Sequence, residues 1–213
     1  MRIAFCIRGL SKEFEASFLN LKTTMLDDLQ CQGHTIDIFL NTYYHNDPTL
    51  FASMMTKFQP VKVLLNKMRT KPAMTYIVPR QCLECIDLVR QYESEHRFQY
   101  DAVIITRFDL TFNAPFSSFD IPHDKLSMEC MFVPDRNSGD NFFYIPRHYL
   151  DAAYTSIQQL QAKRKISHQA WRFFEKNGIP CHYIGGETTK RNPHYDVMFR
   201  FTRYVLTDAS SPC

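Results

Sequence analysis

A buried strand that ends in charge is the feature that most constrains the fold of this chain. The segment 102–106 consists of apolar and β-branched residues, which is typical of a strand covered on both faces. Arg107, Phe108 and Asp109 follow it at once. Because ligands bind outside the carboxyl ends of the strands in an open α/β sheet, this step predicts charged groups at a ligand crevice.

Strand-like and helical segments alternate along most of the chain. This alternation indicates βαβ units with right-handed crossovers, and the closely spaced later strands predict at least one antiparallel member. We expect an α/β fold with a mostly parallel central sheet of about six strands, flanked by helices. The expected strands are 2–7, 35–40, 61–65, 102–106, 126–133, 142–145 and 181–184. The expected helices begin after Ser11 as a cap and at Asp47-Pro48, and span about 80–96, 149–162 and 168–177.

Length and composition favour one ordinary globular domain. The 213 residues include 45% hydrophobic and 22% charged residues, enough for a substantial core. We expect residues 1–213 to form a single, monomeric domain. The composition of 207–213 resembles a linker, which predicts that further domains follow.

Charge and cysteine content limit the partners and the compartment. The formal net charge of +3 is too small to indicate nucleic-acid binding, and no block of lysine and arginine indicates it either. We therefore expect no nucleic-acid partner. The chain has no stretch of about 18 apolar residues, so we expect no membrane span. Its N-terminus lacks the pattern of a secretory signal. The seven cysteines predict reduced thiols in the cytoplasm. Cys82 and Cys85 form a Cys-x-x-Cys pair without a second pair, so we interpret them as buried thiols on a helix rather than half of a zinc site.

The common glycine-rich phosphate loops are missing. The chain has no Gly-x-Gly-x-x-Gly after the first strand, no Gly-x4-Gly-Lys-Ser/Thr and no Gly-x-Ser-x-Gly. These absences count against Rossmann dinucleotide sites, P-loop NTPases and the usual α/β-hydrolases. A fold that binds nucleotides without such a loop needs another positive charge, which a divalent ion on Asp109 would supply. Taken alone, Asp109 could also be a turn former.

Further polar groups are expected at the same sheet edge. Arg8 and Gly9 follow the first strand, and the segment 41–44 follows the second. An aromatic ring of Tyr43 or Tyr44 suits a nucleobase, although the two could instead be a partly buried pair that covers the sheet.

Two later segments carry candidate groups. In Asn137-Ser138-Gly139-Asp140-Asn141, Gly139 permits close backbone approach or a positive φ, and Asp140 could meet a sugar hydroxyl or the reacting centre. A plain hairpin turn is the competing interpretation. The segment 185–194 could be a mobile lid, with Lys190 or Arg191 on a diphosphate and His194 or His182 as a metal ligand. It could equally be a solvated loop.

The pattern Tyr100-Asp101-x-Val103-Ile104-x-x-Arg107-x-Asp109-Leu110 resembles the Asp-x-Asp region of GT-A-fold glycosyltransferases. The resemblance covers residues 1–184 and extends to viral enzymes of capsid glycan synthesis, which would act in the host cytoplasm. It implies transfer of a sugar from a UDP-sugar donor to a glycan or glycoprotein hydroxyl, with Mn²⁺ or Mg²⁺ as cofactor. The chain departs from the family in having Arg107 at the first acidic position.

The resemblance also implies roles for individual residues. The metal would bind Asp109, with His194 as a weaker ligand, and Asp140 would position the reacting groups of a retaining transfer or act as the base of an inverting one. The nucleotide sugar would contact the remaining candidates, which are Ile7, Arg8, Gly9, Thr42, Tyr43, Arg80, Arg107, Lys190 and Arg191. The alternatives are a sugar-phosphate nucleotidyltransferase and a non-catalytic nucleotide-sugar-binding module.

Overall fold

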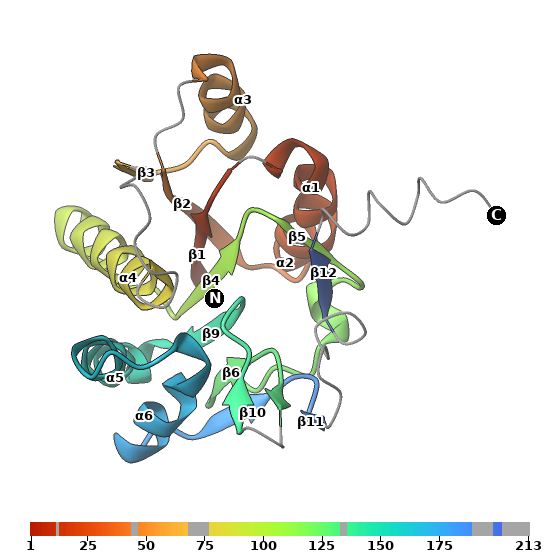
Figure 1. Ribbon diagram of the computed structural model, residues 1–213. Coiled ribbons are helices and arrows are strands. Elements are labelled where there is room, and N and C mark those ends of the chain that lie inside the picture. Colours follow the sequence, from red (N-terminus) through yellow and green to blue (C-terminus); the bar gives the residue numbers. More distant parts are fainter. Residues whose placement is uncertain (12, 44–46, 68–76, 133–135, 189–197, 202–213) are drawn as a thin grey trace.

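The computed structural model describes residues 1–11, 13–43, 47–67, 77–132, 136–188 and 198–201. Within this part of the chain, helices pack on both faces of a central sheet (Figure 1). No helix among these residues is both long and apolar enough to cross a membrane.

The central sheet has seven strands in the order β10-β6-β9-β4-β1-β2-β3. Every neighbouring pair is parallel except the two that involve β9, which runs antiparallel to β4 and β6. The structure thus confirms a mostly parallel sheet with an antiparallel member, with seven strands rather than about six. The strands are β1 (Arg2–Gly9), β2 (Thr35–Tyr43), β3 (Lys62–Asn66), β4 (Ala102–Arg107), β6 (Leu126–Met128), β9 (Phe143–Pro146) and β10 (Cys181–Tyr183).

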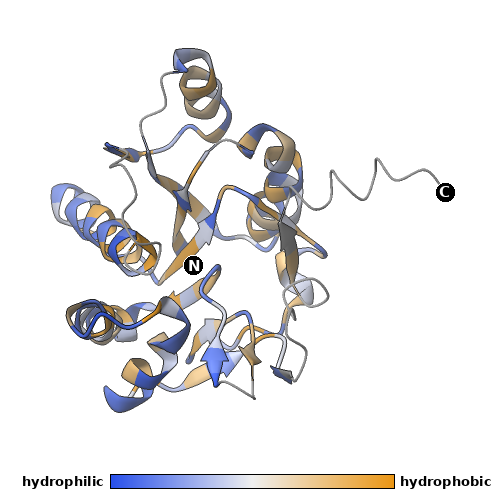
Figure 2. Cartoon of the chain, in the orientation of Figure 1, coloured by the Kyte–Doolittle hydropathy of each residue, from blue (hydrophilic) through white to orange (hydrophobic). Residues whose placement is uncertain are grey.

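Two apolar cores separate the sheet from its helices (Figure 2). Along β1, Ala4 and Cys6 join the core under α4, whereas Ile3, Phe5 and Ile7 join the opposite core. This alternation follows from the two-residue period of a strand. The first core also contains α5 and α6, and the second contains α1, α2 and α3. The helices are α1 (Phe14–Leu21), α2 (Asp27–Cys31), α3 (Pro48–Phe58), α4 (Ile77–His96), α5 (Leu150–Ala162) and α6 (Ala170–Lys176).

Short elements connect the main ones. A π-helical turn, η1 (Lys22–Leu26), joins α1 to α2, and the 3-10 turns are η3 (Phe116–Ser118), η4 (Arg147–Tyr149) and η5 (Ser167–Gln169). β5 (Leu110–Phe112) pairs with β12 (Phe199–Phe201). β7 (Met131–Phe132) pairs with both β8 (Asn137–Ser138) and β11 (Glu187–Thr188). The single strand expected at 126–133 is therefore wrong: it is divided into β6 and β7, which belong to different sheets.

Helix starts agree with the sequence at one place and differ at another. Asp47 caps α3, because its Oδ1 accepts hydrogen bonds from the backbone nitrogens of Thr49 and Leu50, both at 3.0 Å. The cap expected at Ser11 is wrong. α1 begins after Glu13 without a side-chain cap, and Ser11 contributes only its carbonyl, which accepts from the backbone nitrogen of Phe14.

The Cys-x-x-Cys pair lies on α4 as expected. Cys82 and Cys85 are both free and buried in the core beside Cys6. Burial raises the pKa of Cys82 to about 12, so its thiol stays protonated and unreactive at neutral pH. This is the behaviour of a small hydrophobic residue.

Candidate functional site

The strand order creates a switch point between β1 and β4. From β1 the chain passes outward to β2 and β3, then returns through α4 to β4 on the other side of β1. Ligands of open α/β sheets bind at the carboxyl ends of the strands on either side of such a point. Arg8 and Arg107 are register partners at the ends of these two strands, and Arg8 is also the partner of Asn41 on β2.

Arg8 is a fully buried cation with a spare donor. Its side chain and backbone together are 1% exposed, and its Nη2 donates to the carbonyl oxygen of Asp140. Its Nε has no hydrogen-bond partner among the described residues. Burying an N–H without a partner costs free energy, so this donor marks a place where a ligand acceptor would stabilise the protein.

Arg107 forms a two-pronged ion pair with Asp109. Its Nε donates to Oδ1 at 2.8 Å and its Nη2 donates to Oδ2 at 2.6 Å, while Nη1 donates to Oδ1 of Asn141 at 3.1 Å. Burial by itself lowers the pKa of Arg107, but the hydrogen bonds and charge of Asp109 outweigh burial and the pKa is raised. The cation at the end of β4 is therefore permanent.

Asp140 lies at the centre of the polar groups, 6% exposed. The hydroxyl of Ser167 donates to its Oδ2, and Nδ1 of His168 lies 3.9 Å from its Oδ1. Burial favours the neutral acid, but His168, Arg8, Ser167 and Arg107 together hold the pKa of Asp140 below its ordinary value. Asp140 is thus a buried, ionised carboxylate at neutral pH.

Gly139 is required by close approach rather than by its φ angle. A Cβ built at this position would lie 1.8 Å from both Cγ and Oε1 of Glu129. Glu129 in turn accepts from Nδ2 of Asn141 at 3.2 Å. The glycine therefore allows the segment before β9 to pack directly on the Glu129 side chain that follows β6.

The end of β2 carries a second polar network, held by the start of α4. Nδ2 of Asn41 donates to the carbonyl of Gln81 at 3.1 Å and to Oε2 of Glu84 at 3.0 Å. Arg80 donates from its Nε to Oε1 of Glu84 at 2.6 Å. Burial raises the pKa of the neighbouring Tyr43, against the opposing charges of Arg80 and Arg8. Tyr43 therefore lies within electrostatic range of both guanidinium groups.

A small apolar hollow opens beside Tyr43. It has a volume of about 130 Å³, and its lining includes Ser11, Thr42, Tyr43, Phe51 and Leu65. The hydroxyl of Thr42 is engaged, since it donates to the carbonyl of Gly9 at 2.9 Å. Pockets for drug-sized ligands are roughly 300–1,000 Å³, so this hollow suits one ring-sized part of a larger ligand.

The described residues do not present a preformed divalent-cation site. Both carboxylate oxygens of Asp109 are held by Arg107. In the part of the chain that the structure covers, no three His, Cys, Asp or Glu side chains are grouped so that they could hold a metal. Binding of Mn²⁺ or Mg²⁺ at Asp109 stays a prediction, and it requires the carboxylate to be released from Arg107.

The other predicted residues are placed as follows. Ile7 is fully buried in the core, so its side chain is not available to a ligand. Gly9 adopts a φ of 107°, which favours glycine. His182 lies on β10, the outermost strand on the side away from β3. Tyr44, Lys190, Arg191 and His194 lie outside the described residues.

Four residues at this edge were not predicted as functional. Glu129, Asn141, Ser167 and His168 all contact the predicted candidates through the bonds described above. Ser167 and His168 belong to η5. Ser167 follows Asp140 by 27 residues in the sequence. A distant serine and histidine beside a helix carry no local signal of a site, so only the packing of α5 and α6 reveals them.

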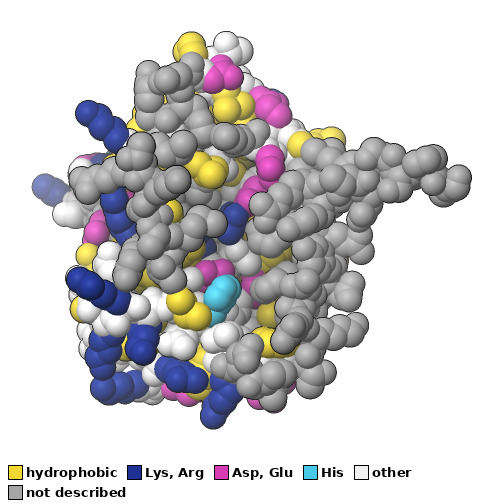
Figure 3. Space-filling view, viewed as in Figure 1, with side chains coloured by type: hydrophobic (Ala, Val, Ile, Leu, Met, Phe, Trp, Pro, Cys, Tyr) yellow, Lys and Arg dark blue, Asp and Glu magenta, His cyan; other side chains and the backbone are white. Residues whose placement is uncertain are grey.

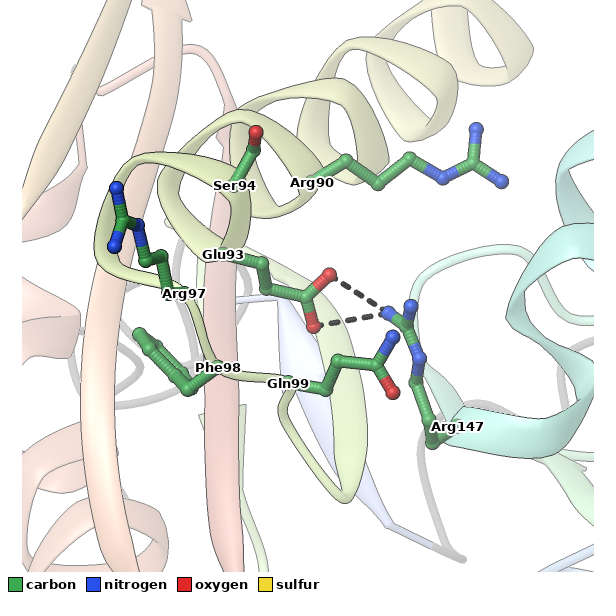
Figure 4. Close-up of a pocket in the computed structure, with 7 residues that line it drawn as sticks. All are labelled: Arg90, Glu93, Ser94, Arg97, Phe98, Gln99 and Arg147. Carbon is green, nitrogen blue, oxygen red and sulfur yellow. Dashed lines mark hydrogen bonds and ion pairs between the residues drawn. The ribbon is translucent and has the colours of Figure 1, made fainter.

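A second hollow, larger than the one beside Tyr43, lies at the opposite edge of the sheet. Its volume is about 680 Å³ and its lining includes Arg90, Glu93, Arg97 and Arg147. Glu93 holds Arg147 through both carboxylate oxygens, whereas the side chains of Arg90 and Arg97 point away from each other (Figure 4). Because these guanidinium groups do not converge, we consider the smaller hollow and the polar edge around Asp140 the functional candidate.

Comparison with known proteins gives no family assignment. No protein-family model matches the chain, and no curated protein matches its sequence.

Proposed function

We propose that this chain is a glycosyltransferase that moves a sugar from a nucleoside-diphosphate sugar, a UDP-sugar by the sequence resemblance, to a glycan hydroxyl. One observation carries the proposal: Arg8 and Arg107 are neighbours at the switch point of the sheet, and both lie near the ionised Asp140. Cations set beside the carboxylates Asp109 and Asp140 match a donor whose diphosphate is negative and whose sugar carbon becomes positive during transfer.

The two arginines are the proposed diphosphate contacts. Guanidinium groups bind phosphate oxygens through paired, charge-assisted hydrogen bonds, and they keep their charge at any physiological pH. Arg8 is 1% exposed, so its unpaired Nε would gain an acceptor from the ligand once the site opens around the side chain. The second turn of α4 meets Asn41 at the same edge, through the carbonyl of Gln81 and the carboxylate of Glu84.

The hollow beside Tyr43 is the proposed position of the nucleobase. It is lined by Tyr43 and Phe51 together with hydroxyl-bearing side chains. It lies at the carboxyl end of β2, which pairs with β1, the strand of Arg8. A base in this hollow would have its diphosphate near Arg8, because Thr42 at the hollow is the register partner of Gly9.

Asp140 is the proposed group at the reacting sugar carbon. Glycosyl transfer passes through an oxocarbenium-like state, which a nearby carboxylate stabilises. Arg8 and Arg107 would meanwhile stabilise the charge that develops on the departing nucleoside diphosphate. In this arrangement Asp140 positions the reacting groups of a retaining transfer.

Calorimetry with UDP-, GDP- and dTDP-sugars, each with and without Mn²⁺, tests the proposal. We expect saturable binding of at least one of these donors, and we expect Asp140→Asn to keep donor binding while transfer is lost. Failure of every donor to bind in both conditions would rule the function out. A parallel measurement with Asp109→Asn tests the metal: a Mn²⁺-dependent gain in affinity that this variant lacks would support a cation at Asp109.

A non-catalytic nucleotide-sugar-binding module is the second candidate. It is favoured by the Arg107 fork, which occupies the carboxylate where the resemblance implies a metal. Release of nucleoside diphosphate separates the two functions. An enzyme releases it slowly from a bound donor even with water as acceptor, whereas a binding module leaves the donor intact.

A further inference from the structure

Exposed cations gather on one side of the site. Figure 3 shows Lys and Arg side chains over α5 and α6, beside acidic side chains and a histidine on the same face. We call this the basic surface and define it by six exposed residues: Arg136, Lys163, Arg164, Lys165, Arg172 and Lys176. No ion pair among the described residues involves any of the six. Glu175 is the exposed acid on the same helix.

The six positive charges of this surface are twice the formal net charge of the whole chain. The formal net charge of +3 becomes −3 when these six positive charges are left out. Like charges held close together repel one another, so such a cluster without acidic partners is expected to attract anions.

Three of the six cations lie against aromatic rings of α6. The guanidinium carbons of Arg136 and Arg172 lie 4.7 Å and 5.3 Å from the ring centre of Trp171, and Nζ of Lys163 lies 5.7 Å from that of Phe173. The indole nitrogen of Trp171 donates to the carbonyl of Arg136 at 2.7 Å, which fixes the ring. Two arginines held against one indole form a preorganised pair of anion contacts.

The basic surface continues directly into the site. Arg136 precedes the segment that leads through Ser138 to Asp140, and Lys165 precedes Ser167 and His168 by two and three residues. These two segments are joined, since Nδ1 of His168 donates to the carbonyl of Ser138 at 3.0 Å. A ligand on the basic surface would therefore lie beside the two segments that carry Asp140 and Ser167.

We infer that the basic surface binds the acceptor, and that the acceptor is a glycan carrying negatively charged groups such as phosphate, sulfate or carboxylate. This inference rests on the proposed function. A membrane surface fits less well, because the exposed large hydrophobic residues among those described are Met1, Leu10, Leu19 and Leu65, none of them on the basic surface.

Trp171 provides a direct test, because it is the one tryptophan of the chain and lies under the two arginines. Its fluorescence would be followed during titration with a heparin-derived hexasaccharide at constant ionic strength. We expect a saturable change with this anionic glycan and none with the neutral maltohexaose. The variant Lys163→Gln/Arg164→Gln/Lys165→Gln should bind about tenfold more weakly, since each exposed charge contributes a modest amount.

A matched variant controls for net charge. Lys22→Gln/Lys57→Gln/Lys62→Gln removes the same three charges from elsewhere, where each lysine has an acidic partner, and should leave glycan binding unchanged. Arg136→Gln/Arg172→Gln is a second probe of the basic surface and should also weaken binding. Wild-type affinity in both Lys163→Gln/Arg164→Gln/Lys165→Gln and Arg136→Gln/Arg172→Gln, or an equal response to maltohexaose, would overturn the inference. Tighter binding of phosphatidylglycerol vesicles or duplex DNA than of the glycan would also overturn it.

The donor titration separates this inference from the proposed function. Donor binding that is normal in wild type and in the Lys163→Gln/Arg164→Gln/Lys165→Gln variant, together with no glycan binding, refutes the anionic acceptor and leaves the enzyme proposal standing. Glycan binding in a protein that binds no nucleotide sugar refutes the proposed function, and the acceptor assignment with it.

Discussion

At the scale of single residues, the site is defined by charges that are buried together. Arg8 is 1% exposed and Asp140 is 6% exposed. Arg8 donates a hydrogen bond to the carbonyl of Asp140, and the carboxylate of Asp140 accepts one from Ser167. Such groups are costly to bury unless they satisfy one another, and part of the donor capacity of Arg8 is left over. A function that uses a negatively charged ligand accounts for this arrangement.

The depressed pKa of Asp140 predicts a pH-dependent contribution to stability. A carboxyl group with a lowered pKa in the folded state stabilises the fold above its unfolded-state value, about 3.8, and loses this effect as the pH falls through the folded value. Wild type should therefore exceed Asp140→Asn in free energy of unfolding by a constant margin above about pH 5. The margin should shrink below about pH 4, as measured by urea unfolding at a series of pH values. A margin that grows toward low pH would contradict the assignment.

Close packing at Gly139 predicts a cost for any side chain there. Gly139→Ala would push a methyl group into Glu129, and overpacking of this kind costs about 1–3 kcal/mol of unfolding free energy. Glu129→Ala removes the three clashing atoms, so the double variant should recover stability relative to the sum of the single changes. Strict additivity in denaturant unfolding would show that the two residues do not meet.

Single residues also show what the sequence could and could not predict. Asp109 and Arg107 were predicted at the strand end, but their ion pair was not, because a spacing of two residues does not say whether side chains turn toward each other. The close approach of Gly139 was anticipated as one of two possibilities. Ser167 and His168 could not be predicted, because their contact with Asp140 depends on the path of two helices.

At the scale of elements, an ion pair fastens α4 to the start of the α5 segment. Glu93 of α4 is 5% exposed and accepts two hydrogen bonds from Nη1 of Arg147 and one from the backbone nitrogen of Tyr100. Arg90 of the same helix pairs with Asp151 of α5, whose side chain is 85% exposed. Both ion pairs connect α4 to the segment that contains η4 and α5, but their acidic side chains differ greatly in burial.

This difference predicts unequal effects of removing the acids. Glu93→Ala leaves the Arg147 cation and a backbone N–H without a partner and should cost about 3 kcal/mol of unfolding free energy. Asp151→Ala serves as the matched control and should cost less than about 1 kcal/mol. Comparable losses for the two variants in thermal or urea unfolding would show that burial does not govern these pairs.

Element boundaries were predicted best where a local rule applied. Asp47-Pro48 fixed the start of α3, and the buried run 102–106 fixed β4 within one residue. The region after β6 was not predicted, because β7, β8 and β11 are two-residue strands that form only through pairing with distant parts of the chain.

At the scale of the whole molecule, topology determines which residues can act together. The mostly parallel sheet was predicted from the alternation of elements, and it brings the ends of β1, β2 and β4 to one edge. The strand order was not predicted, since alternation alone does not say on which side of β1 the fourth strand lies. That order is what makes Arg8 and Arg107 neighbours and places the candidate site between them.

Donor binding at the switch point is tested most directly by calorimetry in the presence of a chelator. The affinity for a UDP-sugar is compared between wild type, Arg107→Gln and the control Arg90→Gln. Arg107 is a proposed phosphate contact, whereas Arg90 lies at the opposite edge of the sheet. The substitution Arg90→Gln therefore removes the same charge at a distance from the proposed site. Loss of charge-assisted hydrogen bonds should weaken binding by roughly tenfold or more in Arg107→Gln, and Arg90→Gln should match the wild type. Equal affinity of wild type and Arg107→Gln would contradict the central claim that the donor diphosphate binds at the switch point of the sheet.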